Sequence, residues 1–287
     1  MKSAALRVGM IRYLNCLPFY FGLETMVREK GLAAKFLESH PADLCRSLAA
    51  GEIDLAPVSS IEYLMRQKDY LIFPDLAIGA EDFVRSVTLF SKVPVNELNH
   101  STIALSEESL SSATLLKILL KLRFGFTNQF ETVAQDPARI LDGHKAALMI
   151  GDAALFFESE DWVYKYDLGA MWREWTGTPF VFALWTIRRE SARERPEEIR
   201  EIERMLKCNL ERNLADPETL LRKASGILPT EQRFVQMTGY LANMRYGLDD
   251  EMIGGLGKFF RLAHEEKLAP EPQSLEFFLK VCWRFEE

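Results

Sequence analysis

The chain has 287 residues, of which 48% are hydrophobic and 27% charged, the composition of a globular protein with one large or two medium domains. Its 35 basic and 42 acidic residues give a formal charge of −7, which argues against a nucleic-acid partner but allows a local pocket for a small anion. The cysteines form no CxxC pair and predict neither a disulfide framework nor a zinc site; they are Cys16, Cys45, Cys208 and Cys282.

The first polar loop of the sequence follows a short strand. Residues 8–11 predict this buried strand, and Pro18 suits the first turn of a following helix. A strand that ends in a polar loop and opens a helix is the usual ligand corner of an open α/β sheet. In this loop Arg12 carries a fixed charge, and Asn15 can both donate and accept hydrogen bonds. Taken alone, the loop is explained more simply as a turn.

The same pattern repeats along the first fifth of the chain. Between residues 19 and 58, two predicted helices, each ended by a glycine, alternate with short strands. Ser59 and Glu62 then have capping-box spacing for a further helix. Alternating strands and helices predict a parallel sheet that is covered on its faces.

A second α/β set is predicted between two further strands. Residues 84–91 alternate with the period of a strand, and residues 181–187 form another. Beyond these the chain becomes helical and charged. We therefore predict two lobes: lobe I comprises residues 1–91 and 184–287, and lobe II comprises residues 92–183. In such a fold the ligand lies in the cleft between the lobes.

Hydroxyl and amide side chains gather at the predicted strand ends. Ser109, Ser111 and Ser112 stand where a helix begins, and the free backbone N–H groups of a helix start favour a carboxylate. Taken singly, each serine is explained as a cap or a turn, and Asp152 as the cap of the helix that follows the strand at 146–150. Their joint occurrence at successive strand ends is what indicates a binding site.

Conventional catalytic motifs are missing from the sequence. No GxSxG elbow, HExxH pair, Walker loop or GxGxxG fingerprint occurs, and we predict no metal and no cofactor. The histidines lie outside the strand-end loops; they are His40, His100, His144 and His264. The first residues are too few for a signal peptide and no apolar run approaches roughly 20 residues, so we expect a cytoplasmic protein without a membrane partner.

Several blocks of sequence, taken together, resemble the chorismate dehydratase family of the futalosine route to menaquinone. The blocks are residues 12–15 (RYLN) with Pro18, 51–63 (GEIDLAPVSSIEY), 85–87 (RSV), 150–155 (IGDAAL) and 176–183 (TGTPFVFA). The resemblance extends over residues 6–190, and the order YLN, PVSSIEY, IGDAAL is specific.

The resemblance implies an α/β, two-lobed periplasmic-binding-protein type II fold used as an enzyme. It also implies a hydro-lyase reaction in which chorismate loses water to give 3-[(1-carboxyvinyl)oxy]benzoate. Asn15 and Ser86 match the family's active-site positions, so we expect them to contact the reacting part of the substrate. The other residues predicted to bind substrate are Arg12, Ser59, Ser60, Ser109, Ser111, Ser112, Gly151, Asp152 and Thr178. The general base stays open between a protein group and the substrate's own enolpyruvyl carboxylate.

Two alternatives to this function stay open. The sister enzyme of the same route makes 1,4-dihydroxy-6-naphthoate on the same fold, but that family is expected to carry a catalytic histidine where this chain has Gly151 and Asp152. A non-enzymatic binding protein of similar fold would hold chorismate or another small carboxylate unchanged. In each case the partner is a small molecule, and we expect a monomer or a homodimer.

Overall fold

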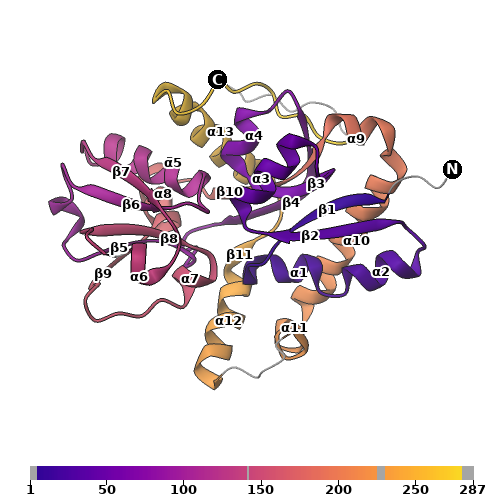
Figure 1. Cartoon of the computed structure of the whole chain (residues 1–287), viewed down its shortest axis with the longest axis horizontal. Coiled ribbons are helices and arrows are strands. Elements are labelled where there is room, and N and C mark those ends of the chain that lie inside the picture. The colour runs from indigo at the N-terminus through magenta and orange to yellow at the C-terminus, as the bar shows by residue number, and fades with distance from the viewer. Residues whose placement is uncertain (1–4, 141, 225–229, 280–287) are drawn as a thin grey trace.

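The protein consists of two lobes, each built on one β-sheet (Figure 1). The computed structural model describes residues 5–140, 142–224 and 230–279, so Cys282 lies outside the described residues. The strands of lobe I are β1 (Leu6–Ile11), β2 (Ala34–Ser39), β3 (Leu55–Ser59), β4 (Tyr70–Ala80), β10 (Phe180–Arg188) and β11 (Met244–Arg245). The strands of lobe II are β5 (Val87–Ser91), β6 (Thr102–Ser106), β7 (Gln129–Val133), β8 (Ala146–Ile150) and β9 (Tyr164–Asp167).

The two sheets share one plan. Lobe I has the strand order β11-β4-β10-β3-β1-β2 and lobe II the order β7-β6-β8-β5-β9. In lobe I, β1 lies parallel between β2 and β3, and in lobe II, β6 lies parallel between β7 and β8, as predicted from the alternating pattern. Each sheet also has an antiparallel strand that directly follows a crossing between the lobes: β10 joins β3 and β4, and β5 joins β8 and β9. In lobe I the short β11 is antiparallel to β4 as well.

These pairings place the lobe boundaries at other residues than the sequence predicts. Residues 84–91 were assigned to lobe I, but β5 pairs only with lobe II strands. Residues 181–183 were assigned to lobe II, but β10 pairs with lobe I strands along its whole length. The chain therefore crosses near residues 81–86 and 177–179. Alternation of side chains identifies a strand but does not say which sheet it joins.

Helices cover the faces of both sheets. Those of the first part of lobe I are α1 (Leu17–Tyr20), α2 (Leu23–Glu29), α3 (Pro41–Ala50) and α4 (Ser60–Met65), preceded by the 3-10 turn η1 (Leu14–Cys16). Lobe II has α5 (Ser111–Ile118), α6 (Pro137–Ile140), α7 (Gly151–Leu155) and α8 (Leu168–Thr176). Its other helical turns are η2 (Val95–Glu97) and η3 (Leu119–Arg123). The first of the two helices predicted between residues 19 and 58 is broken, because Gly22 takes a left-handed φ of +89° that a right-handed helix does not allow.

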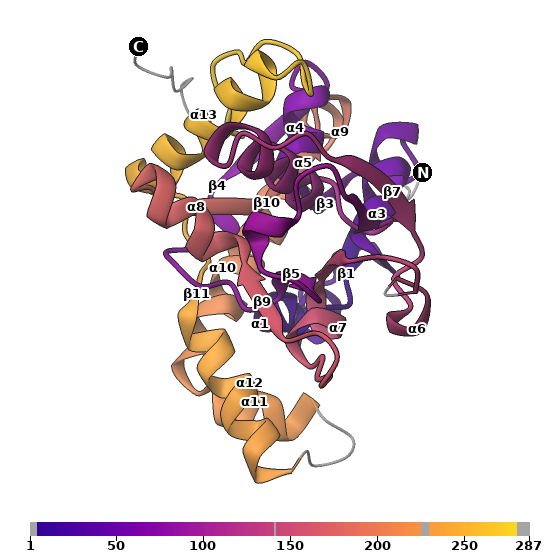
Figure 2. The same cartoon turned by 90° about the vertical axis from the view of Figure 1, so that its left-hand side faces the viewer.

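The C-terminal helices pack back onto lobe I, as predicted, and also reach lobe II. They are α9 (Arg189–Glu194), α10 (Pro196–Ala215), α11 (Pro217–Ala224), α12 (Glu231–Asn243) and α13 (Asp250–Glu265). Asn209 of α10 donates a hydrogen bond to the carbonyl of Phe19 at 2.7 Å. Phe259 of α13 is fully buried and packs edge to face against Trp172 of lobe II and Phe180 of lobe I. Figure 2 shows α11 and α12 as a pair at the end of the molecule near α1 and α7.

Within the described ranges, no helix combines the length and the apolar character that crossing a membrane requires. The phenylalanines of the tail are used for packing, since Phe260 and Phe278 are 1% and 3% exposed. The cytoplasmic location and the monomeric or dimeric state stay predictions.

Candidate active site

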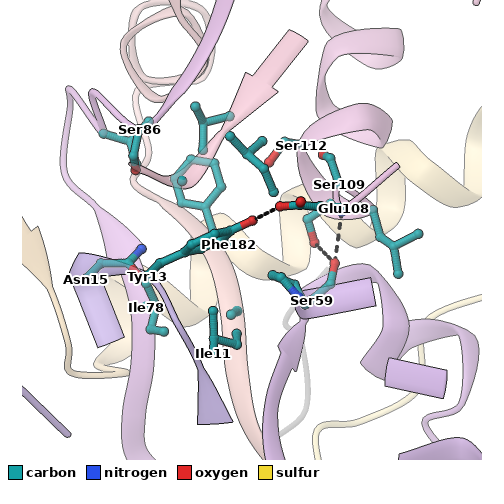
Figure 3. A pocket seen from close by; sticks show the side chains of 18 of the residues that line it. Ile11, Tyr13, Asn15, Ser59, Ile78, Ser86, Glu108, Ser109, Ser112 and Phe182 are labelled. Atoms are coloured by element: carbon teal, nitrogen blue, oxygen red, sulfur yellow. Dashed lines mark hydrogen bonds between the residues drawn. The ribbon is translucent and has the colours of Figure 1, made fainter. Parts of the chain in front are cut away.

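The candidate site is a pocket between the lobes, where loops at the strand ends face each other (Figure 3). It contains about 580 Å³ of empty space, its open mouth included. Its apolar wall is formed by Ile11, Ile78, Val84, Val87, Ile150 and Phe182. Asn15 and Ser86 lie at one end, and a second polar group lies at the other end: Ser59, Glu108, Ser109 and Ser112. An apolar middle with polar ends suits a ring that carries polar groups at opposite edges.

Ser86 is held in the crossing between β4 and β5. It is 1% exposed, and its carbonyl accepts a hydrogen bond from the Gly151 backbone N–H at 2.8 Å. The residue before it, Arg85, takes a left-handed φ of +59°, and the Asp167 carboxylate accepts its N–H at 2.5 Å. Tyr240 of α12 donates to Ser86 Oγ at 2.8 Å. Two hydrogen bonds therefore hold the backbone around Ser86 and a third holds its side chain, while the Arg85 side chain is exposed outside the pocket.

Asn15 enters the same end of the pocket from η1, directly after β1. Its Oδ1 accepts a hydrogen bond from Cys16 Sγ at 3.3 Å, which leaves the Nδ2 group to donate elsewhere. Figure 3 shows its side chain reaching into the space that Ser86 also faces. The structure thus brings together the two residues that the sequence proposes for the reacting part of the substrate.

Asp152 plays a part that the sequence did not predict. The expectation that it caps α7 was wrong, because the N-terminus of α7 has no side-chain cap. Instead its Oδ1 accepts the Leu14 backbone N–H at 3.0 Å, which ties lobe II to the loop that carries Asn15. Burial raises the pKa of this carboxyl, and the bond from Leu14 opposes that shift.

At the opposite end of the pocket, serines from the two lobes bond to each other. Ser111 Oγ lies 2.6 Å from Ser59 Oγ and 2.8 Å from Ser60 Oγ, and it accepts the Ile61 N–H at 3.0 Å. The Ser111 N–H in turn donates to Ser59 Oγ at 2.9 Å. The predicted capping box from Ser59 to Glu62 is wrong, since Ser59 makes no side-chain cap bond to α4. The Ser59 Oγ atom instead accepts its hydrogen bond from Ser111 of the other lobe.

Replacing Ser111 by Ala is expected to lower the free energy of unfolding by about 1–3 kcal/mol, because buried polar groups in both lobes lose their partner. Urea denaturation monitored by circular dichroism measures this change. Ser112→Ala is the matched control: the Ser112 hydroxyl is also buried but makes no hydrogen bond to any described residue. Equal stability losses in the two variants would contradict the assignment of the Ser111 network.

Tyr13 and Glu108 form a contact across the pocket that sequence reasoning missed as a pair. The Tyr13 hydroxyl, from lobe I, donates to the Glu108 carboxylate of lobe II (Figure 3). Gln135 Nε2 also donates to this carboxylate, at 2.9 Å, and His40 Nδ1 lies 3.2 Å from it. Burial and the neighbouring Glu108 charge raise the pKa of Tyr13, so it keeps its proton at neutral pH. The Glu108 carboxylate therefore has three polar neighbours: Tyr13, Gln135 and His40.

Gly151 gives the Tyr13 ring its place. It takes a left-handed φ of +63°, and a Cβ atom built on it would stand 2.6 Å from the ring. A side chain therefore does not fit between the start of α7 and the ring. Gly151 lines the pocket, as the sequence proposed, but its role is to leave room for an aromatic ring.

Four of the residues proposed for substrate binding do not line this pocket: Arg12, Ser60, Asp152 and Thr178. Arg12 pairs with Glu38 at 2.7 Å and is largely exposed. Thr178 accepts a hydrogen bond from Trp172 Nε1 at 3.2 Å and lies at the crossing into β10. Ser60 is fully buried and donates to the Val181 carbonyl at 2.8 Å. The remaining proposed residues, Asn15, Ser59, Ser86, Ser109, Ser111, Ser112 and Gly151, all line it.

The missed residues left only weak signals in the sequence. Glu108 stands inside the serine-rich loop, where it looked like an ordinary solvated charge. Tyr240 lies in a helix whose pattern is merely amphipathic. Among the described residues that line the pocket, Glu108 alone carries a formal charge, and none of the described part offers a group of ligands arranged to hold a metal ion.

Comparison with known sequences identifies a family profile and related proteins that match this chain. A sequence profile described as menaquinone biosynthesis matches residues 6–265. A chorismate dehydratase of Thermus thermophilus is 32% identical over 270 residues, which cover 88% of this chain and 93% of that protein. A chorismate dehydratase of Campylobacter jejuni is 32% identical over 177 residues, which cover 61% of this chain and 64% of that protein.

Solved structures agree on the fold. A protein of Archaeoglobus fulgidus superposes with a TM-score of 0.70 at 17% identity, covering 93% of this chain and all of that one. The periplasmic aliphatic sulphonate binding protein of Escherichia coli superposes with a TM-score of 0.64 at 18% identity, covering 100% of this chain and 95% of that one. The expected periplasmic-binding-protein-like fold is confirmed. By the sequence profile and the Thermus thermophilus relative, the chain belongs to the menaquinone biosynthesis family.

Proposed function

We propose that this protein is a chorismate dehydratase, which eliminates water from chorismate to give 3-[(1-carboxyvinyl)oxy]benzoate. The observation that carries the proposal is the pocket: Asn15 and Ser86 meet at one end of an apolar space, and hydroxyls at a helix start stand at the other. The relatives from Thermus thermophilus and Campylobacter jejuni, both chorismate dehydratases, support the choice of substrate.

The reaction asks for positioning more than for strong catalytic groups. The hydrogen to be removed lies on the ring carbon that bears the enolpyruvyl ether, and conjugation through a double bond to the ring carboxylate makes it acidic. Its loss, together with the neighbouring hydroxyl, creates an aromatic ring and so supplies the driving force. The protein has to hold two carboxylates, orient the ring and help hydroxide to leave.

The two ends of the pocket divide this work. Asn15 and Ser86 donate hydrogen bonds to the reacting part of the substrate. Ser109 and Ser112, at the start of α5, hold a carboxylate there. Ser109 Oγ accepts the Ala113 N–H at 3.1 Å, so its own proton is free to point at an anion. The apolar wall keeps the ring flat between the two ends.

The general base is assigned to the substrate. Glu108 is the carboxylate that lines the pocket in the described part of the chain, but it already accepts hydrogen bonds from Tyr13 and Gln135, and His40 Nδ1 lies 3.2 Å from it. The ether oxygen joins the enolpyruvyl group of chorismate to the ring carbon that bears the acidic hydrogen. The carboxylate of this group can therefore accept that proton.

Incubation of the purified protein with chorismate, followed by mass spectrometry, tests the proposal. We expect a product that has lost one water and shows the ultraviolet spectrum of a substituted benzoate. A no-protein sample is the control, because chorismate also rearranges without a catalyst. Unchanged chorismate beside an active relative in the same buffer would overturn the proposal and favour a binding protein.

The naphthoate synthase alternative finds no support in the pocket. None of the histidines lines it in the described part of the chain. His144 lies before β8, with its Nε2 3.2 Å from the Glu131 carboxylate at the edge of lobe II. His40 reaches Glu108 from outside the pocket.

A further inference from the structure

Tyr240 contacts the site from a C-terminal helix in which the sequence predicts no site residue. It lies in α12, far from the other site residues in sequence, and is 1% exposed. Its hydroxyl donates to Ser86 Oγ at 2.8 Å. Because Tyr240 does not line the pocket, it acts on a substrate only through the residues that it contacts.

We propose that Tyr240 is a positioning residue that orients the Ser86 hydroxyl toward the pocket. The inference rests on the proposed function, because it concerns the step in which Ser86 assists the leaving hydroxide. It assigns to a C-terminal helix a part in the chemistry carried out between the lobes.

The direction of the hydrogen bonds supports this role. A tyrosine hydroxyl has one proton, and here that proton goes to Ser86 Oγ. Burial raises the pKa of Tyr240, so it stays protonated and remains a donor over the whole neutral range. Ser86 Oγ has thereby accepted one bond, and its own proton is left to point into the pocket. A donor that is itself hydrogen-bonded in this way is a stronger donor.

Asn15 is the second polar group at this end of the pocket. Its Oδ1 accepts a hydrogen bond from Cys16 Sγ, so its Nδ2 group is left to donate. The Asn15 side chain lowers the pKa of Tyr240 against the larger effect of burial, which raises it. Two donors, the Asn15 amide and the Ser86 hydroxyl, therefore face this end of the pocket.

α12 is anchored on both sides of Tyr240. Gln236 Nε2 donates to the Leu155 carbonyl at 2.9 Å, and Asn243 Nδ2 donates to the Phe83 carbonyl at 2.7 Å. Both carbonyls belong to segments that flank the pocket, at the end of α7 and in the crossing before Ser86. The hydroxyl is therefore held in place by the backbone of its helix rather than by the single bond to Ser86.

The chain offers a matched control in Tyr246. It is also a buried tyrosine, 5% exposed, and it follows α12 by only a few residues. Its hydroxyl makes no hydrogen bond to any described residue. Replacing it by Phe removes the same group from a similar environment without touching Ser86.

The test is a double-mutant cycle on chorismate turnover with Tyr240→Phe, Ser86→Ala and the double variant. For Tyr240→Phe we expect kcat to fall about tenfold, the effect of one buried hydrogen bond, with KM changed by less than about threefold. In the Ser86→Ala background the same change is expected to alter kcat by less than about twofold, because the residue through which Tyr240 acts is gone. Tyr246→Phe is expected to turn over at the wild-type rate.

Two results would overturn the inference. One is a Tyr240→Phe variant with wild-type kcat; the other is an equal loss of kcat from Tyr240→Phe with and without Ser86, which indicates a purely structural role. Thermal denaturation of each variant shows whether it is folded. Failure of the proposed function is recognised separately, because the wild-type protein itself would then form no product.

Discussion

The variant Asn15→Ala is expected to lower kcat/KM for chorismate by roughly 100-fold or more, the usual effect of removing one donor aimed at developing charge. Asn15 is half-buried at the end of the pocket that Ser86 also faces. Its Nδ2 group is the donor that Ala removes, and no neighbouring side chain replaces it. Steady-state kinetics followed by the absorbance of the aromatic product measure the change.

The fold is expected to survive this substitution. Among the described residues the Asn15 side chain hydrogen-bonds only to Cys16 Sγ, so its loss leaves η1 in place through the bond from Leu14 to Asp152. Asn96→Ala, at an exposed position outside the pocket, is the control and is expected to keep full activity. Near-normal turnover by Asn15→Ala would contradict the proposal that Asn15 donates to the reacting part of the substrate.

Gly151→Ala is the second substitution for which we expect a large effect, with kcat/KM lowered by at least about tenfold. The added Cβ would stand 2.6 Å from the Tyr13 ring, closer than non-bonded carbon atoms allow, so the ring has to move. Tyr13 then loses its hydrogen bond to Glu108, which joins the two lobes across the pocket. The left-handed φ of +63° adds about 1–2 kcal/mol of backbone strain.

Gly125→Ala separates the two parts of this effect. Gly125 has a similar φ of +70°, but a Cβ there meets nothing within 4 Å. Gly125→Ala is therefore expected to lose in urea denaturation only the stability that backbone strain costs and to keep full activity, whereas Gly151→Ala loses more stability and also loses activity. If Gly125→Ala were equally inactive, or Gly151→Ala fully active, the role given to the Tyr13 ring would be wrong.

The parts of the fold that depend on local pattern were predictable from the sequence. Strands that alternate with helices gave the class and the two lobes, and the loop around Asn15 was recognisable as a ligand corner because strand, polar loop and helix start follow one another there. The sheet that each of β5 and β10 joins was not predictable, because the alternation of side chains identifies a strand but not its neighbours.

The site was predictable as far as neighbours in sequence could show it. Ser59 has an ideal capping partner three residues on, yet its oxygen bonds to Ser111 of the other lobe. Asp152 likewise bonds to Leu14 rather than to its own helix. In both cases the side chain bonds to a residue of the other lobe instead of to its own helix. The two bonded groups are buried together, and each would otherwise be left without a hydrogen-bond partner. Glu108 and Tyr240 joined the site through the same kind of distant contact.

The place of β10 in the lobe I sheet also bears on the order in which the protein folds during synthesis. All the strands of lobe II lie between residues 87 and 167, so that sheet is complete in one continuous stretch of chain. The sheet of lobe I cannot be completed until later in synthesis, because β10 lies in its middle, between β3 and β4, and ends only at Arg188. During synthesis the first four strands therefore leave the ribosome before the strand that joins them, and lobe II can form while lobe I is still open.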